Sequence, residues 1–207
     1  EMEETAMENN HRHVILIADD SPDMRGYLAK ELSENYNVVV APNGQDALEI
    51  LHNQRVDLVV SDIMMPNMDG CTLCNNIKTD TELSHIPVIL LTAAVGMETR
   101  IETLEAGADG YIEKPFAFEL LQATIDNLFR NREIANQQFV HSPLAHFSSV
   151  VTGDLDHEFM DRLHDVVMQH LSEPDLNIET LTQELGTSKS TLYRKVRANL
   201  GLNINEY

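Results

Sequence analysis

The chain of 207 residues is poor in basic residues, has few cysteines and lacks any long apolar run. Its 14 Lys and Arg against 34 Asp and Glu give a formal net charge of −20. This balance argues against a polyanion-binding surface over the whole chain, although a local basic patch remains compatible with it. The only cysteines, Cys71 and Cys74, form a single CxxC pair, which cannot supply the four thiolates of a structural zinc site. We interpret them as small apolar residues of a reduced, cytoplasmic protein.

No stretch approaches the ~20 consecutive apolar residues that a membrane-spanning helix needs. Residues 1–11 are mostly acidic and polar and have neither the basic start nor the apolar core of a signal peptide, so we interpret them as a linker or an appended segment. The length favours one complete domain and a smaller or incomplete second one.

Five short apolar segments alternate with segments of helical apolar spacing. The strand-like segments are 13–18, 36–41, 57–61, 86–92 and 109–113, and the helical patterns are centred on 24–32, 47–51, 97–104 and 121–129, the last extending toward Phe139. Ser21 followed by Pro22 is typical of a helix start. This alternation predicts an α/β fold, a doubly wound (βα)5 unit with a parallel sheet and helices on both faces.

Polar side chains stand at the carboxyl ends of four of these predicted strands, the edge where sites form in open parallel sheets. They are Asp19, Asp20, Asp62, Thr92 and Lys114. Singly, each has an ordinary explanation: a loop cap or helix-start acid, a strand-end hydroxyl, a solvated lysine. Together, the three carboxylates would repel one another unless a cation joined them, and hard oxygen ligands suit Mg²⁺. A carboxylate in such a site can attack phosphorus while the metal, an ammonium and a hydroxyl stabilise the charge on the transferring oxygens.

The motifs Asp19-Asp20, Asp62 with Met65-Pro-Asn-Met-Asp-Gly70 behind it, Leu91-Thr92-Ala93 and Tyr111-Ile-Glu-Lys114-Pro115-Phe116 resemble the receiver domain of two-component response regulators. We expect this domain, with its flavodoxin-like fold, at residues 12–136. The resemblance implies that Asp62 accepts a phosphoryl group from a histidine kinase. It also implies that Asp20, Asp62 and the Met64 carbonyl bind Mg²⁺ or Mn²⁺, with Asp19 acting through metal-bound water.

The same resemblance assigns phosphoryl contacts and a switch to Thr92, Ala93, Lys114 and Tyr111. An added phosphoryl charge would draw the Thr92 hydroxyl inward and leave space into which Tyr111 turns. The fourth helix, fifth strand and fifth helix would then form a candidate homodimer surface.

After a connector expected at 137–155, helical spacing returns in a small all-α segment. Asn177 is expected to cap a helix over 178–185 that Gly186 closes, and Ser188 to cap another over 189–200, which together make a helix-turn-helix candidate. The motifs Leu181-Thr-Gln-Glu-Leu-Gly186, Ser188-Lys-Ser-Thr-Leu-Tyr-Arg-Lys195 and Gly201-Leu-Asn-Ile-Asn-Glu-Tyr207 resemble the first part of an AraC-type DNA-binding domain, over 156–207. The candidate DNA-contacting residues are Lys189, Ser190, Thr191, Arg194, Lys195 and Arg197, although an ordinary solvated helix face is an alternative.

A receiver followed by this type of domain resembles the output end of hybrid two-component regulators, whose parent chain would be a histidine kinase in the inner membrane with these domains in the cytoplasm. We therefore predict a phosphorylation-controlled transcription regulator, not itself an enzyme beyond assisting its own phosphorylation. Its expected partners are a histidine kinase, in cis or in trans, and promoter DNA through the complete C-terminal domain. The resemblance also suggests control of carbohydrate-use genes.

Two alternatives come from other functional classes. A Mg²⁺-dependent phosphatase or hydrolase of the haloacid dehalogenase kind also uses a strand-end aspartate, but such enzymes carry a second aspartate two residues later, where this chain has Met64. The second alternative is a phosphorelay or docking protein, in which the receiver would act without any DNA-binding function.

Overall fold

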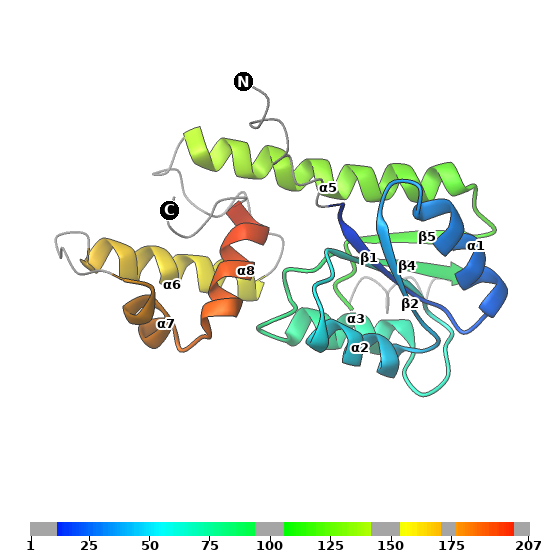
Figure 1. The fold of residues 1–207 in the computed structure, drawn as a ribbon, viewed down its shortest axis with the longest axis horizontal. Coiled ribbons are helices and arrows are strands. Elements are labelled where there is room, and N and C mark those ends of the chain that lie inside the picture. Colours follow the sequence, from blue (N-terminus) through cyan, green and yellow to red (C-terminus); the bar gives the residue numbers. More distant parts are fainter. Residues whose placement is uncertain (1–11, 94–105, 142–153, 171–176, 201–207) are drawn as a thin grey trace, which may run out of the picture. The chain divides into compact units, whose positions relative to one another are not determined.

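The structure, a computed structural model, describes residues 12–93, 106–141, 154–170 and 177–200 (Figure 1). The chain divides into two compact units. The first is formed by Glu1–Cys74 and Ile86–Phe116, and the second by Asn75–His85 and Ala117–Tyr207. None of the helices within the described ranges has both the length and the apolar character to cross a membrane.

A parallel five-stranded sheet in the order β2-β1-β3-β4-β5 forms the centre of the first unit. The strands are β1 (Val14–Ala18), β2 (Asn37–Ala41), β3 (Leu58–Asp62), β4 (Val88–Ala93) and β5 (Gly110–Lys114). Every residue of the central strand β3 is buried, as expected for a run that is apolar on both faces. The predicted flavodoxin-like sheet is therefore confirmed, with strand bounds that shift by one or two residues.

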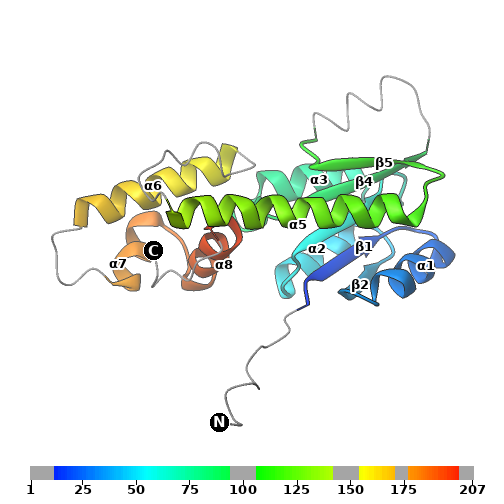
Figure 2. The ribbon, with the colours of Figure 1, turned by 90° about the horizontal axis from the view of Figure 1, so that it is seen from above.

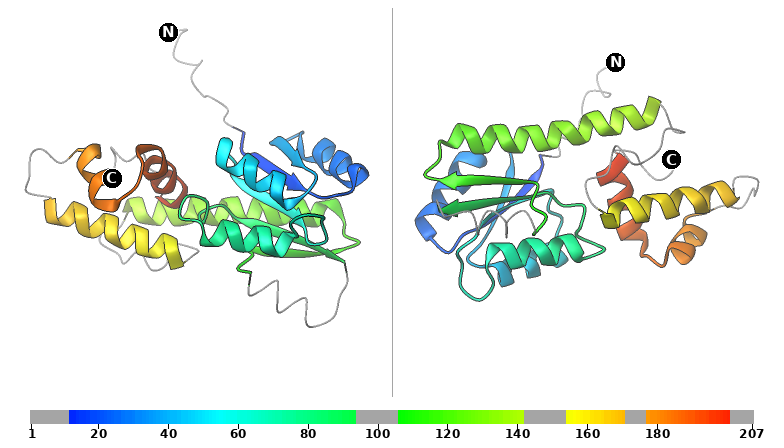
Figure 3. Two further views of the ribbon diagram at one scale, coloured as in Figure 1. Left: turned by 90° about the horizontal axis from the view of Figure 1, so that it is seen from below. Right: turned by 180° about the vertical axis from the view of Figure 1, so that it is seen from behind.

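Three helices begin in the first unit: α1 (Pro22–Leu32), α2 (Gly44–Asn53) and α3 (Gly70–Thr79). The Ser21 side chain accepts a hydrogen bond from the amide of Met24, which confirms the predicted cap of α1. Helix α2 lies on the opposite face of the sheet from α1 (Figures 1 and 3), so the sheet is doubly wound. The helix expected over 97–104 lies outside the described residues.

The second unit contains α5 (Phe118–His141), α6 (Asp154–His170), α7 (Ile178–Leu185) and α8 (Lys189–Leu200). The bounds of α7 and α8 are those that the caps at Asn177 and Ser188 predict. The predicted extension of the fifth helix toward Phe139 is confirmed, and the helix continues to His141, so residues 137–141, which the sequence assigned to a connector, are helical.

Helices α7 and α8 pack on one side of α6 (Figure 2). Their shared core consists of Met160, Leu163, Leu181, Leu185, Leu192 and Val196. Gly186 adopts a left-handed conformation, φ 62° and ψ 35°, and turns the chain from α7 toward α8. Amphipathic spacing thus gives each of these three helices one apolar face.

Candidate functional site

Three carboxylates meet at the carboxyl ends of β1 and β3. The two strands are paired in parallel with Ala18 opposite Ser61, so Asp19 and Asp62 fall beside each other. One oxygen from each of Asp19, Asp20 and Asp62 can be chosen so that all three lie within 4.8 Å of one another. Asp19 and Asp62 are buried, whereas Asp20 is exposed. The predicted acidic cluster is therefore present, with one side open to solvent.

Backbone contacts hold Asp62 in place. Its Oδ1 accepts a hydrogen bond of 2.9 Å from the Ile63 amide, and the carbonyl of Ile63 accepts one of 2.9 Å from the amide of Gly70. A Cβ atom on Gly70 would lie 2.1 Å from the carbonyl oxygen of Asp62. Only glycine allows α3 to begin this close to the backbone of the aspartate, a requirement that the sequence alone did not reveal.

Lys114 reaches the cluster from the end of β5. Its Nζ lies 3.0 Å from Asp19 Oδ2 and 3.0 Å from Asp62 Oδ1. Burial acts to lower the pKa of Lys114, but the hydrogen bonds to Asp62 and Asp19 outweigh it and raise this pKa. Burial also raises the pKa of Asp62, an effect that the bond from Lys114 opposes only in part. One ammonium therefore bridges two carboxylates in a largely desolvated position.

The remaining predicted residues surround this pair. Thr92 is half-buried and its Oγ1 donates to the Ala93 carbonyl at 3.0 Å, while Ala93 is exposed. In β4 and β5, Leu90 lies opposite Tyr111 and Thr92 opposite Glu113, so Thr92 and Tyr111 share one face of the sheet. The Tyr111 side chain is partly exposed and that of Met64 largely exposed.

The donor set fits a hard divalent cation. Carboxylate oxygens are the ligands that Mg²⁺ prefers, and Mg²⁺ needs only one or two of them because it keeps several waters. The exposure of Asp20 leaves room for such waters on one side of the cluster.

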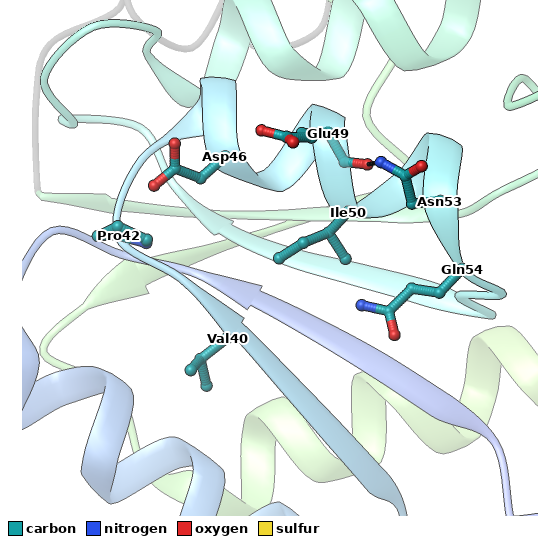
Figure 4. A pocket seen from close by; sticks show the side chains of 7 residues that line it. All are labelled: Val40, Pro42, Asp46, Glu49, Ile50, Asn53 and Gln54. Carbon is teal, nitrogen blue, oxygen red and sulfur yellow. Dashed lines mark hydrogen bonds between the residues drawn. The ribbon is translucent and has the colours of Figure 1, made fainter.

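A separate hollow lies between the edge strand β2 and α2. It is lined by Val40, Pro42, Asp46, Glu49, Ile50, Asn53 and Gln54 (Figure 4). It contains none of the predicted site residues.

The candidate DNA-contacting residues of α8 do not share one exposed face. Thr191 is 4% exposed and Lys195 is 2% exposed, so both side chains are buried in this structure rather than presented on an open helix face. The reason is helical spacing: Lys195 follows Leu192 by three residues and precedes Val196, which places it on the core side of α8. Its ammonium lies 2.7 Å from Asp156 Oδ1 and 5.0 Å from the centre of the Phe159 ring.

The other candidates on α8 differ in exposure. Ser190 is exposed and its hydroxyl lies 2.9 Å from that of Ser188. Lys189 is exposed and pairs with Glu179 at 2.7 Å, and Arg194 lies 3.6 Å from Glu82. The side chain of Arg197 lies outside the described residues. The sequence did not single out Asp156 or Glu82, because each partner is far away in the chain.

Residues 15–126 match the family of the response regulator receiver domain. The chain belongs to this family. It is 31% identical to histidine kinase P4 of Formosa agariphila over 204 residues, which is 99% of this chain and 15% of that protein. It is 36% identical to response regulator MprA of Mycobacterium ulcerans over 66% of this chain and 58% of that one.

Solved receiver structures have the same fold. The signal receiver domain of a signal transduction histidine kinase from Syntrophus aciditrophicus is 38% identical, with a TM-score of 0.55 over 56% of this chain and 89% of that one. The receiver domain of the Francisella response regulator 1452 is 31% identical, with a TM-score of 0.53. The chain spans only 15% and 58% of the lengths of the two curated relatives named above.

Proposed function

We propose that the receiver accepts a phosphoryl group on Asp62 from a histidine kinase. The observation that carries this proposal is the buried Asp62 carboxylate with the Lys114 ammonium 3.0 Å away and two further carboxylates beside it. An oxygen of Asp62 forms the new bond to phosphorus as the P–N bond of a phosphohistidine breaks. The histidine nitrogen leaves with the bonding electrons and takes up a proton.

The residues around Asp62 stabilise the transferring group. Lys114 places a positive charge next to the attacking oxygen and remains paired with Asp19. Asp19, Asp20, Asp62 and the Met64 carbonyl would hold Mg²⁺ or Mn²⁺, which supplies further charge neutralisation. Without a cation, the carboxylates would repel an incoming phosphate.

The phosphorylated state is read out through Thr92 and Tyr111. The Thr92 hydroxyl and Ala93 contact the phosphoryl group, and the inward movement of Thr92 lets Tyr111 turn from its partly exposed position. The resulting change of surface around β5 and α5 favours pairing of two receivers.

A phosphoryl mimic tests the acceptor directly. Beryllium fluoride should give a bound signal in ¹⁹F NMR with the native chain and Mg²⁺, and no bound signal with Asp62→Asn or with EDTA. A matched control is Asp57→Asn, because Asp57 is a half-buried carboxylate that precedes β3 rather than ending it. This variant should bind the mimic. An unchanged bound signal from Asp62→Asn would contradict the assignment.

We further propose that the chain is the output part of a hybrid two-component regulator with an AraC-type DNA-binding domain, which would control carbohydrate-use genes. Two observations support this proposal: the paired helices α7 and α8, and the similarity to histidine kinase P4 over nearly the whole chain. The names of other relatives include a probable transcriptional regulator of Cyanidium caldarium.

Promoter binding by this chain should be weak. One helix-turn-helix unit offers few base contacts, each worth about 1–3 kcal/mol for a good bidentate pair. A longer chain with two such units should bind the promoter much more tightly and with sequence preference. The measurement is fluorescence anisotropy of labelled promoter DNA with both chains at physiological salt. Equal, sequence-specific binding by both chains would contradict this division of roles.

A further inference from the structure

In the second unit, the segment Asp80–His85 contacts α8 through Glu82. One carboxylate oxygen, Oε1, accepts a hydrogen bond of 2.8 Å from the Thr191 hydroxyl. The other, Oε2, lies 3.6 Å from Nη2 of Arg194. Thr191 and Arg194 are two of the side chains that the sequence assigned to nucleic-acid contact. A carboxylate of the same chain therefore occupies both.

The same segment is fixed to α8 by a buried polar network. Ser84 Oγ donates to Asp156 Oδ1 at 3.0 Å, and the Lys195 ammonium donates to Ser84 Oγ at 3.2 Å and to Asp156 Oδ1 at 2.7 Å. All three side chains are buried. Asp80 shapes the loop, because its Oδ1 accepts from the Glu82 amide at 2.6 Å. Glu82 is thus presented to α8 by an ordered loop.

Several basic side chains also lie near His85, which ends this segment. Lys78, Arg132, Arg194 and Lys195 all act on His85, and after burial they are the causes that lower its pKa. The Nε atom of Arg194 is buried and has no hydrogen-bond partner among the residues that the structure describes. Glu82 therefore satisfies only part of the capacity of this surface for an anion.

We propose that Glu82 is an intramolecular competitor for phosphate on α8, and that a nucleic-acid backbone reaches Thr191 and Arg194 only when Glu82 leaves them. A hydroxyl and a guanidinium held by one carboxylate can hold a phosphodiester in the same way, since both anions accept charge-assisted hydrogen bonds. This inference rests on the proposed DNA-binding output. It adds that, in the chain without DNA, Glu82 occupies the side chains of α8 that would contact the phosphate.

The contacts that Glu82 makes with α8 are weak enough for a phosphate to displace it. The Glu82 side chain is half-exposed and its pair with Arg194 is long, 3.6 Å, and pairs of this kind contribute little to stability. The buried bonds of Ser84 and Lys195 can hold the loop while Glu82 alone moves aside. Removing the Glu82 charge should therefore leave the fold intact and weaken the hold of this side chain on Arg194 and Thr191.

The test compares Glu82→Gln with a charge-matched control, Glu49→Gln, whose side chain is exposed on α2 in the first unit. The probe is a short fluorescein-labelled duplex of mixed sequence at low salt, with anisotropy as the measurement and circular dichroism melting to confirm folding. Glu82→Gln should bind about two- to fivefold more tightly than the native chain, the range expected for removing a weak competing ion pair. Glu49→Gln should change affinity less than about twofold, since it alters only the net charge.

The outcomes separate this inference from the DNA-binding proposal. Equal measurable binding by the native chain and Glu82→Gln would overturn the competitor while leaving DNA binding in place. If neither the native chain nor Glu82→Gln binds the duplex, the competitor inference and the proposal that α8 binds DNA are both overturned. Tighter non-specific binding by Glu82→Gln, together with failure of a longer chain to select a promoter, would support the competitor and contradict the AraC-type assignment.

Discussion

At the scale of single residues, Gly70 and Gly26 differ in whether a larger side chain fits. A methyl group on Gly70 would collide with the backbone of Asp62, whereas one on Gly26, inside α1, would meet nothing within 4 Å. Gly70→Ala should destabilise the fold by roughly 1–3 kcal/mol, as overpacking does, and weaken binding of beryllium fluoride. Gly26→Ala should stabilise it by about 0.5–1 kcal/mol and leave that binding unchanged. Urea unfolding and ¹⁹F NMR measure both effects; equal behaviour of the two variants would refute the role of the close contact.

The buried His85 should make the stability of the folded chain depend on pH. Burial and the charges of Arg132, Arg194, Lys195 and Lys78 lower its pKa from 6.5 to about 3. The unfolded chain therefore binds a proton at a pH where the folded chain does not, and stability falls as pH drops from about 6.5 toward 3.

Replacing His85 should remove this loss. Between about pH 7.5 and pH 5.5 the native chain should lose about 1–1.5 kcal/mol more than His85→Gln does. Urea unfolding at a series of pH values measures the difference. His52→Gln, at an exposed position of α2, is the control and should follow the native chain. Parallel curves for the native chain and His85→Gln would show that folding does not lower the pKa of His85.

At the scale of elements, the ion pair between Lys195 of α8 and Asp156 of α6 joins two helices inside their core. Asp156→Asn leaves a buried ammonium without its counter-charge and should cost about 3–5 kcal/mol. The double substitution Asp156→Leu with Lys195→Met should recover most of that loss, because an apolar pair of similar size needs no desolvation.

Urea unfolding followed by circular dichroism measures these changes. The exposed pair of Glu179 and Lys189 is the control, and Glu179→Gln should change stability little. A large loss from the control, or no recovery in the double variant, would argue against the buried pair as the stabilising contact.

Helices and strands could be predicted from the sequence where the pattern that marks them lies in neighbouring residues. Runs such as Leu58–Asp62 are apolar on both faces and so predict buried strands, and the caps Ser21 and Asn177 mark helix starts through their own side chains. The acidic cluster was predictable for a topological reason, since carboxyl ends of parallel strands share one edge. Two features depend on three-dimensional packing that sequence patterns do not reveal: the close approach of Gly70 to the Asp62 backbone, and the burial of Lys195 against Asp156, which lies 39 residues away.

At the scale of the whole molecule, the receiver fold accounts for the first unit and explains why Asp19 and Asp62 both combine burial at a strand end with the Lys114 ammonium and an adjacent acidic set. The second unit carries a helical pair whose charged residues are largely engaged by its own acids. Phosphoryl acceptance by Asp62 is the central proposal for this chain.

The most direct measurement of that activity is to trap the phosphorylated residue chemically. The chain is incubated with acetyl phosphate and Mg²⁺ and then treated with borohydride, which reduces an acyl phosphate to an alcohol and so converts the acceptor aspartate to homoserine. Peptide mass spectrometry should find homoserine at position 62 alone, and not in samples with EDTA or in Asp62→Asn. Homoserine at another aspartate, or an unmodified position 62 under conditions that phosphorylate the chain, would contradict the account.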